Sequence, residues 1–140
     1  MKERILEEAV RSVLQWHCEL VLSNNPDYAE AIGCLTTHVM SRVYHDHHGR
    51  AYEDQRGARI NILTQFVRKY VEEITDAGNE YRGYNQMTEE LICGALQEID
   101  FREIAEDLIG DYSPKSAEAV AEDEEFFNIM GFDNYDIDED

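Results

Sequence analysis

The chain has 140 residues, 43% of them hydrophobic, and a formal net charge of −19 at pH 7. This length fits one domain that can bury roughly two thirds of its unfolded surface, so neither disulfides nor a structural metal are needed. The charge repels DNA, RNA and anionic lipid, which argues against direct nucleic-acid or membrane binding and favours a partner with a basic surface, typically a nucleic-acid-binding protein.

The first half of the chain predicts three helices. Apolar residues at helical spacing indicate the first over residues 3–22. Asn25 as N-cap and Pro26 at the first helical position predict a second, which we expect to run to about residue 45. Because the connection is so short, these two helices are expected to form an antiparallel hairpin. The third is expected within residues 51–78. The second and third helices should bury Tyr28, Ile32, Leu35, Val39, Val43, Ile60, Leu63, Val67, Tyr70, Val71 and Ile74.

The second half predicts three shorter helices. Thr88 is the expected N-cap of a fourth helix that ends near residue 99. Asp100 and Glu103 are placed for a capping box that starts a fifth, with apolar residues on one face and acids on the other. Ser113 before Pro114 repeats the cap-and-proline pattern and predicts a sixth helix to about residue 129.

The fold class that follows is all-α. Residues 1–130 are expected to form a single domain, a compact bundle of five to six helices, because no strand pattern of useful length and no internal repeat is present. Residues 131–140 alternate acidic and apolar side chains without a helical period, so we expect them to form a mobile acidic tail.

The three cysteines, Cys18, Cys34 and Cys93, are odd in number and widely spaced. This pattern predicts unpaired thiols in a reducing compartment, the cytoplasm. We find no basic segment followed by an apolar run, and no apolar stretch near the roughly 18 residues of a bilayer-crossing helix. Neither a secretion signal nor a membrane span is expected.

Cys34 and His38 lie one turn apart on the predicted second helix, and with His17 or Cys18 of the first they form a legitimate zinc ligand set. We favour a plainer interpretation, in which they edge the interface of the two helices, because the close CxxC pairs of known zinc folds are missing. His17, on the apolar face of its helix, is expected to be a hydrogen-bonded core residue. We therefore expect no metal and no other cofactor.

His45 and Asp46 form a His-Asp pair of the kind that metal-dependent phosphohydrolases use. Such a site needs further ligands from other helices, and His48 is the last histidine in the chain. No other catalytic signature is present, so we do not expect an enzyme.

Residues 42–69 are an exception to the acidity, with six Lys or Arg against three Asp or Glu. The stretch fits a phosphate- or nucleic-acid-binding face, a counter-surface for the acidic end of the same chain, or a face that joins two copies in a homodimer. The two self-contacts are favoured, since the net charge opposes nucleic acid.

Carboxylates gather toward the end of the chain. The last forty residues carry 14 Asp or Glu against 2 Lys or Arg, and so −12 of the net −19. The fifth and sixth predicted helices would each present a row of them, and two such rows on adjacent helices would approximate the phosphate track of a DNA strand. The residues expected to contact a partner are Asp100, Glu103, Glu106, Asp107, Asp111, Glu118, Glu122, Asp123, Glu125, Phe126 and Phe127.

In size, helical content, charge and the acidic, aromatic C-terminal segment EEFFNIMGFDNYDIDED, the chain resembles the small acidic phage-encoded inhibitors that mimic DNA, of the anti-restriction and anti-CRISPR type. The resemblance is one of composition across the whole chain and carries over no residue. The chain differs from those inhibitors in one respect. They spread carboxylates over most of their surface, whereas residues 1–50 here are nearly neutral, with 5 Lys or Arg against 7 Asp or Glu.

The resemblance and the charge together predict a non-enzymatic inhibitor that occupies the basic nucleic-acid groove of a host restriction or CRISPR nuclease, in the host cytoplasm. The alternative is an adaptor, because aromatic residues interleaved with acids can dock in the groove of another protein. Its expected contacts are Phe126, Phe127, Ile129, Met130, Phe132 and Tyr135.

Overall fold

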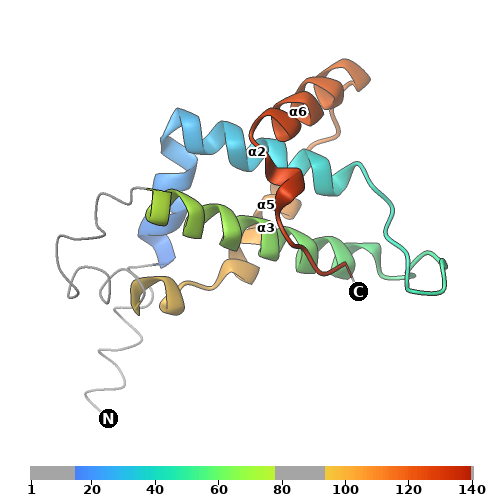
Figure 1. The fold of residues 1–140 in the computed structure, drawn as a ribbon, viewed down its shortest axis with the longest axis horizontal. Helices are drawn as coiled ribbons and strands as arrows, with labels where there is room; N and C mark the ends of the chain where they lie inside the picture. The colour runs from blue at the N-terminus through green and yellow to red at the C-terminus, as the bar shows by residue number, and fades with distance from the viewer. Residues whose placement is uncertain (1–14, 78–93, 140) are drawn as a thin grey trace, which may run out of the picture.

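The computed structural model describes residues 15–77 and 94–139, and these residues form an all-α fold (Figure 1), as predicted. They contain no strand, only an isolated bridge between His45 and Ala51. Residues 15–24 and 94–98 are helical. The other helices are α2 (Pro26–Met40), α3 (Gln55–Ala77), α5 (Phe101–Asp111), α6 (Ala117–Ile129) and the short 3-10 helix η1 (Phe132–Asn134). The predicted N-cap Thr88 and the start of the first predicted helix lie outside the described residues.

Helices α2 and α3 pack against each other and form the middle of the molecule. Helix α5 packs on α3, and α6 packs on α2. Figure 1 shows α6 on the near side of the α2–α3 pair and α5 on its far side. None of the helices in the described residues combines the length and the apolar character needed to cross a membrane.

The core follows the predicted apolar stripes of α2 and α3. Leu35 and Val39 of α2 and Leu63 and Val67 of α3 are fully buried. Thr36 and Thr37 of α2 are buried as well, and their hydroxyls donate to the carbonyl oxygens four residues earlier, so neither hydroxyl is left without a partner. Val43, predicted to be buried, is 58% exposed because α2 ends before it.

The prediction of an antiparallel hairpin for the first two helices is wrong. The N-cap is correct: the Asn25 side chain accepts a hydrogen bond from the amide of Asp27, with Pro26 beginning the helix. Asn25 alone separates the two helices, however, and its own amide donates to the carbonyl of Val21. A reversal needs a loop of about two to five residues. The helices therefore meet at a corner (Figure 1).

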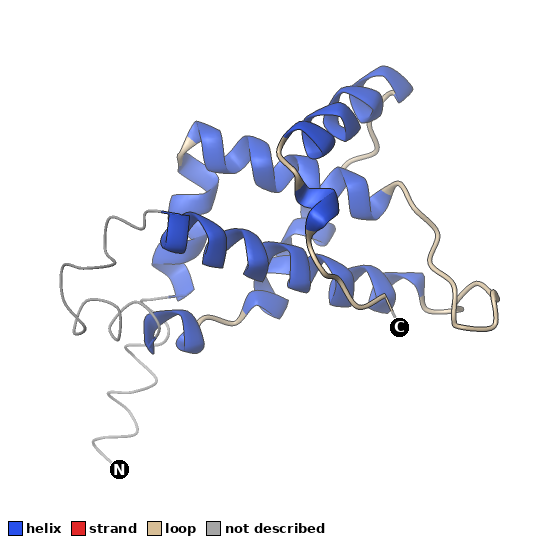
Figure 2. Ribbon diagram, in the orientation of Figure 1, coloured by secondary structure: helices blue, strands red, loops and turns tan. Residues whose placement is uncertain are grey.

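Helix α2 ends at Met40, five residues earlier than predicted. Beyond this point the Gln55 side chain bonds to the backbone. It accepts from the Tyr44 amide and donates to the carbonyl oxygens of Tyr44 and Tyr52. These bonds close the base of the loop between α2 and α3, which extends away from the helices (Figure 2).

The starts of α5 and α6 match the predicted chemistry in part. The Asp100 carboxylate accepts from the Glu103 amide at 3.1 Å, as expected of an N-cap, but the reciprocal bond of a capping box is absent. Instead the Asp100 amide donates to Gln15 at 2.6 Å. Helix α6 is capped by Ser116, whose hydroxyl accepts from Ala119, and not by Ser113. Either serine can offer a side-chain hydroxyl as a cap, so the sequence alone does not distinguish Ser113 from Ser116.

The C-terminal segment, predicted to be a mobile acidic tail, packs on the domain instead. Phe132 is 1% exposed in the core. The Gln65 side chain of α3 donates to the carbonyl of Asp138 and accepts from its amide, both at 2.8 Å, and the Tyr135 hydroxyl donates to Glu73. The apolar residues of this segment pack against the core, while the acids that alternate with them stay exposed. This packing holds the segment on the domain.

Candidate partner-binding surface

Helix α5 is joined to the first helix at its N-terminus. The Gln15 side chain accepts from the Asp100 amide and donates to the Asp100 carbonyl at 2.9 Å. The apolar face of α5, Phe101, Ile104 and Ala105, is buried. Its acids are thereby directed outward, next to the helix of residues 15–24.

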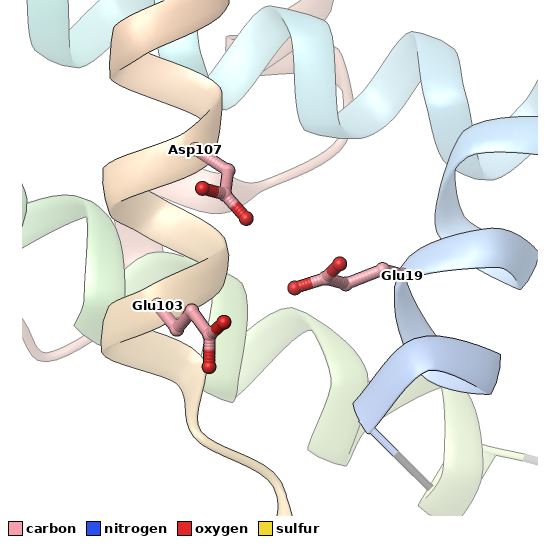
Figure 3. Close-up of side chains that lie close together, drawn as sticks. All are labelled: Glu19, Glu103 and Asp107. Carbon is pink, nitrogen blue, oxygen red and sulfur yellow. The ribbon is translucent and has the colours of Figure 1, made fainter. Parts of the chain in front are cut away.

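Three carboxylates from these two helices face one another. Oxygen atoms of Glu19, Glu103 and Asp107 all lie within 4.8 Å of one another (Figure 3). The pKa of Glu103 is raised above its ordinary value, first by partial desolvation and then by the charges of Glu19, Asp100 and Asp107. We call these three residues the acidic cluster. No Lys or Arg among the described residues forms an ion pair with it.

The acidic cluster is the only group of three or more candidate metal ligands with converging donor atoms in the described part of the chain. Carboxylate oxygens suit Ca²⁺ or Mg²⁺, but Ca²⁺ takes six to eight oxygen ligands and Mg²⁺ requires a near-ideal octahedron. Three mostly exposed side chains, each offering one converging oxygen, supply half of such a shell or less. The geometry therefore defines a concentration of negative charge, without defining a metal site.

A groove of about 390 Å³ opens beside the acidic cluster, between residues 15–24, α2 and α5. Its apolar lining comes from all three helices and consists of Leu22, Ala29, Ile32, Ile104 and Leu108. Its acids are Glu19 and, one turn apart on α5, Asp107 and Asp111. The groove therefore combines an apolar floor with a negative edge.

The acids of α6 are in a different situation, because two of them are paired within the chain. Glu124 accepts from His38 at 2.9 Å and from Arg42 at 2.8 Å, and Asp123 pairs with Lys115 at 2.8 Å. Burial works in the opposite direction, yet the hydrogen bonds from His38 and Arg42 hold the pKa of Glu124 below its ordinary value. Asp123, a predicted partner contact, is thus already engaged.

The other predicted contacts fall into three groups. On α5, Glu103, Asp107 and Asp111 are exposed, Glu106 pairs with Arg102 at 3.2 Å, and Asp100 is the N-cap. On α6 the exposed acids are Glu118, Glu122 and Glu125. Phe126 is half-buried, and Phe127 is 2% exposed, its ring stacked on His38 with centroids 3.7 Å apart. Phe127 is a core residue, and in this structure it cannot touch a partner.

The predicted phosphate track across two adjacent helices is not formed. Helix α5 packs on α3 while α6 packs on α2, so the two helices occupy opposite sides of the α2–α3 pair (Figure 1). The reason lies in their apolar faces: Phe101 and Ile104 anchor α5, whereas Phe127 anchors α6 beside His38 and Phe66. Two separate acidic surfaces result.

The alternative zinc set is not assembled among the described residues. The Cys34 thiol donates to the carbonyl of Asp123, and the imidazole of His38 bonds to Glu124. Burial, followed by the charges of Asp123 and Glu124, raises the pKa of Cys34 to about 12, which disfavours the thiolate that binds a metal. Burial also raises the pKa of Cys18. His17, predicted to be a core residue, is exposed.

The basic stretch 42–69 was predicted, as one of three roles, to be a counter-surface for the acidic end of the same chain. One contact fits that role: Arg42 pairs with Glu124. Arg59 donates to the Arg42 carbonyl, and Arg68 lies 5.6 Å from the centre of the Phe101 ring. Within the same stretch Asp46 accepts from the amides of His48 and Arg50. Asp46 therefore shapes a turn, and this accounts for the His-Asp pair.

The sequence prediction missed Glu19, which lies in the first helix outside the acidic end. No local signal marks it, because only the packing of α5 beside residues 15–24 brings its carboxylate to Glu103 and Asp107. Glu124 was also absent from the predicted contacts. Comparisons with protein-family models, curated proteins and solved structures find no match for this chain.

Proposed function

We propose that this protein is a non-enzymatic inhibitor that binds the basic nucleic-acid-binding surface of a host defence protein, a restriction or CRISPR nuclease, in the host cytoplasm. The contact is made by carboxylates on the α5 side, where half-buried Glu19 and exposed Glu103, Asp107 and Asp111 imitate the charge of nucleic-acid phosphates. The α6 side contributes less, because Asp123 and Glu124 are already paired.

One observation carries this proposal: the acidic cluster has no compensating cation among the described residues. Like charges this close raise the free energy of the folded state, and after desolvation they are the next cause of the raised pKa of Glu103. Asp111 adds to the cost, because it ends α5, where the helix dipole disfavours an anion. A partner that supplies Lys or Arg at this surface relieves both, so part of the binding energy is stored in the free protein.

The test compares two triple variants that each remove three charges. One carries Glu103→Gln, Asp107→Asn and Asp111→Asn on α5; the matched control carries Glu118→Gln, Glu122→Gln and Glu125→Gln on α6. A nuclease captured by the wild type at low salt is assayed for DNA cleavage with each protein added. The α5 triple should inhibit about threefold to about a hundredfold less well, since each exposed ion pair contributes about 0.2–1 kcal/mol and three are removed.

The control should keep most of the inhibition. Equal losses in both triples would mean that net charge alone matters, and unchanged inhibition by the α5 triple would refute the proposed surface. Both triples should fold, because the substitutions change only exposed side chains, and circular dichroism checks this.

A second candidate, the adaptor, retains one observation in its favour: Ile129 is 73% exposed and Met130 is 42% exposed at the end of α6. The aromatic residues Phe127 and Phe132, however, are in the core. An adaptor would therefore use the exposed pair, and Ile129→Ser with Met130→Ser should abolish its partner binding. For the inhibitor, the same double variant should leave inhibition unchanged.

A further inference from the structure

The groove beside the acidic cluster has a floor that charge mimicry alone does not require. Leu22, Ile32, Ile104 and Leu108 come from three different helices and converge on it. Its volume, about 390 Å³, is within the range of pockets that enclose ligand groups. A surface that only imitated phosphates would need carboxylates, and would gain nothing from an apolar recess between them.

Gly33 keeps this recess open. It lies within α2, where glycine is less favourable than alanine by roughly 0.5–1 kcal/mol, and it lines the groove. A Cβ atom at Gly33 would meet no atom within 4 Å, so no steric conflict inside the protein calls for glycine there. The space that a side chain would fill is the groove itself.

The composition of the groove identifies its occupant. An apolar side chain fits the floor, while Lys or Arg side chains on either side of it reach Glu19, Asp107 and Asp111 at the edge. The net charge of −19 disfavours an anionic occupant. Apolar and basic residues alternate in this way along one face of a cationic amphipathic helix, which is a common ligand of helix-lined grooves.

We propose that the groove binds a cationic amphipathic helix of the partner protein, with an apolar side chain inserted over Gly33. This inference rests on the proposed function and sharpens it, because it makes the recognised element a helix with an apolar anchor and not any polycationic surface. The acids then provide steering and orientation, and the recess provides selectivity between basic partners.

The test measures binding of a labelled 15-residue peptide of Leu and Lys at helical spacing by fluorescence anisotropy. Gly33→Met fills the recess without changing any charge, and it should weaken binding at least about tenfold, equivalent to 1.4 kcal/mol. Gly110→Met is the matched control: Gly110 is also helical, its Cβ would also meet no atom within 4 Å, and it does not line the groove. This variant should bind as the wild type does.

A second peptide separates the recess from simple attraction. An oligolysine of equal charge should bind more weakly than the amphipathic peptide, and Gly33→Met should not affect it. The proposal is overturned if both peptides bind equally well, or if Gly33→Met and Gly110→Met behave alike. It is also overturned if the wild type sediments as a dimer that Gly33→Met dissociates, because the occupant would then be a second copy.

Failure here is distinguishable from failure of the proposed function. If the α5 charge triple loses inhibition while Gly33→Met inhibits as the wild type does, the acidic surface stands and the helix-binding groove falls. If the charge triple inhibits normally, the proposed function itself fails, whatever the peptides do.

Discussion

At the scale of single residues, His38 is held on three sides. Its ring stacks on Phe127 with an interplanar angle of 4°, and meets the edge of Phe66 at 5.8 Å. Its Nδ1 lies 2.9 Å from the Glu124 carboxylate. Burial lowers the pKa of His38 even though the hydrogen bond to Glu124 raises it, so the ring is neutral at pH 7. Because Glu124 is ionised there, Nδ1 carries the proton and donates it.

These shifts predict that stability falls as the pH falls from 7.5 to 5. The folded pKa of His38 lies below its ordinary value of 6.5, so the unfolded chain takes up the proton first and unfolding becomes easier below that pH. The lowered pKa of Glu124 acts in the same direction from about pH 4.5 downward, whereas the raised pKa of Glu103 opposes the fall as the pH approaches 4.5. Urea unfolding at several pH values should show a falling midpoint, and His38→Gln should flatten the fall between pH 7.5 and 5.5.

The same change at His17 provides the control, since that side chain is exposed and lies outside this network. His17→Gln should keep the wild-type dependence on pH. A His38→Gln protein whose midpoint still falls as steeply as the wild type's would show that other groups cause the acid sensitivity.

At the scale of helices, the sequence predicts those features that depend on neighbouring residues. The Asn25 and Asp100 caps and the stripes of α2 and α3 occur as predicted, because capping and periodicity are local properties. The side on which a helix packs is not local. Nothing within α6 shows that Phe127 will stack on His38, or that α5 and α6 will cover opposite sides of α2 and α3.

The C-terminal segment shows the same limit more sharply. Its alternation of acids and apolar residues resembles a disordered tail when it is considered alone. In the structure Phe132 contacts the rings of Tyr70 and Phe127, and the Gln65 side chain bonds to the backbone of Asp138. The partners come from α3 and α6, so the segment's order is a tertiary property that its own residues do not specify.

Phe132→Ala is therefore expected to destabilise the whole protein by about 3–5 kcal/mol, the usual cost of removing a buried phenylalanine. Chemical denaturation followed by circular dichroism measures this loss. Ile129→Ala, three residues earlier and 73% exposed, should change the free energy of unfolding by no more than about 0.5 kcal/mol. Similar small effects at both positions would mean that the segment does not belong to the cooperative unit.

At the scale of the whole molecule, the charge of −19 has two opposite consequences. Within the free protein it is a cost, because carboxylates such as those of the acidic cluster repel one another and only some, including Glu124, are paired. Toward a basic partner it is an attraction. Salt screens both interactions, since the Debye length falls from about 30 Å at 0.01 M to about 8 Å at 0.15 M.

Stability and binding should therefore respond to salt with opposite signs. Raising NaCl from 10 to 150 mM should raise the melting temperature of the free protein by a few degrees, because about 1 kcal/mol of relieved repulsion corresponds to roughly 2–8 °C for a domain of this size. The same change should weaken binding to the basic partner. Neutralising Glu103, Asp107 and Asp111 together should reduce both effects, since this removes two carboxylates of the acidic cluster and a third one beside it. A melting temperature that is insensitive to salt would mean that the cluster stores no repulsion for a partner to relieve, and binding would then have to be explained by contacts other than charge.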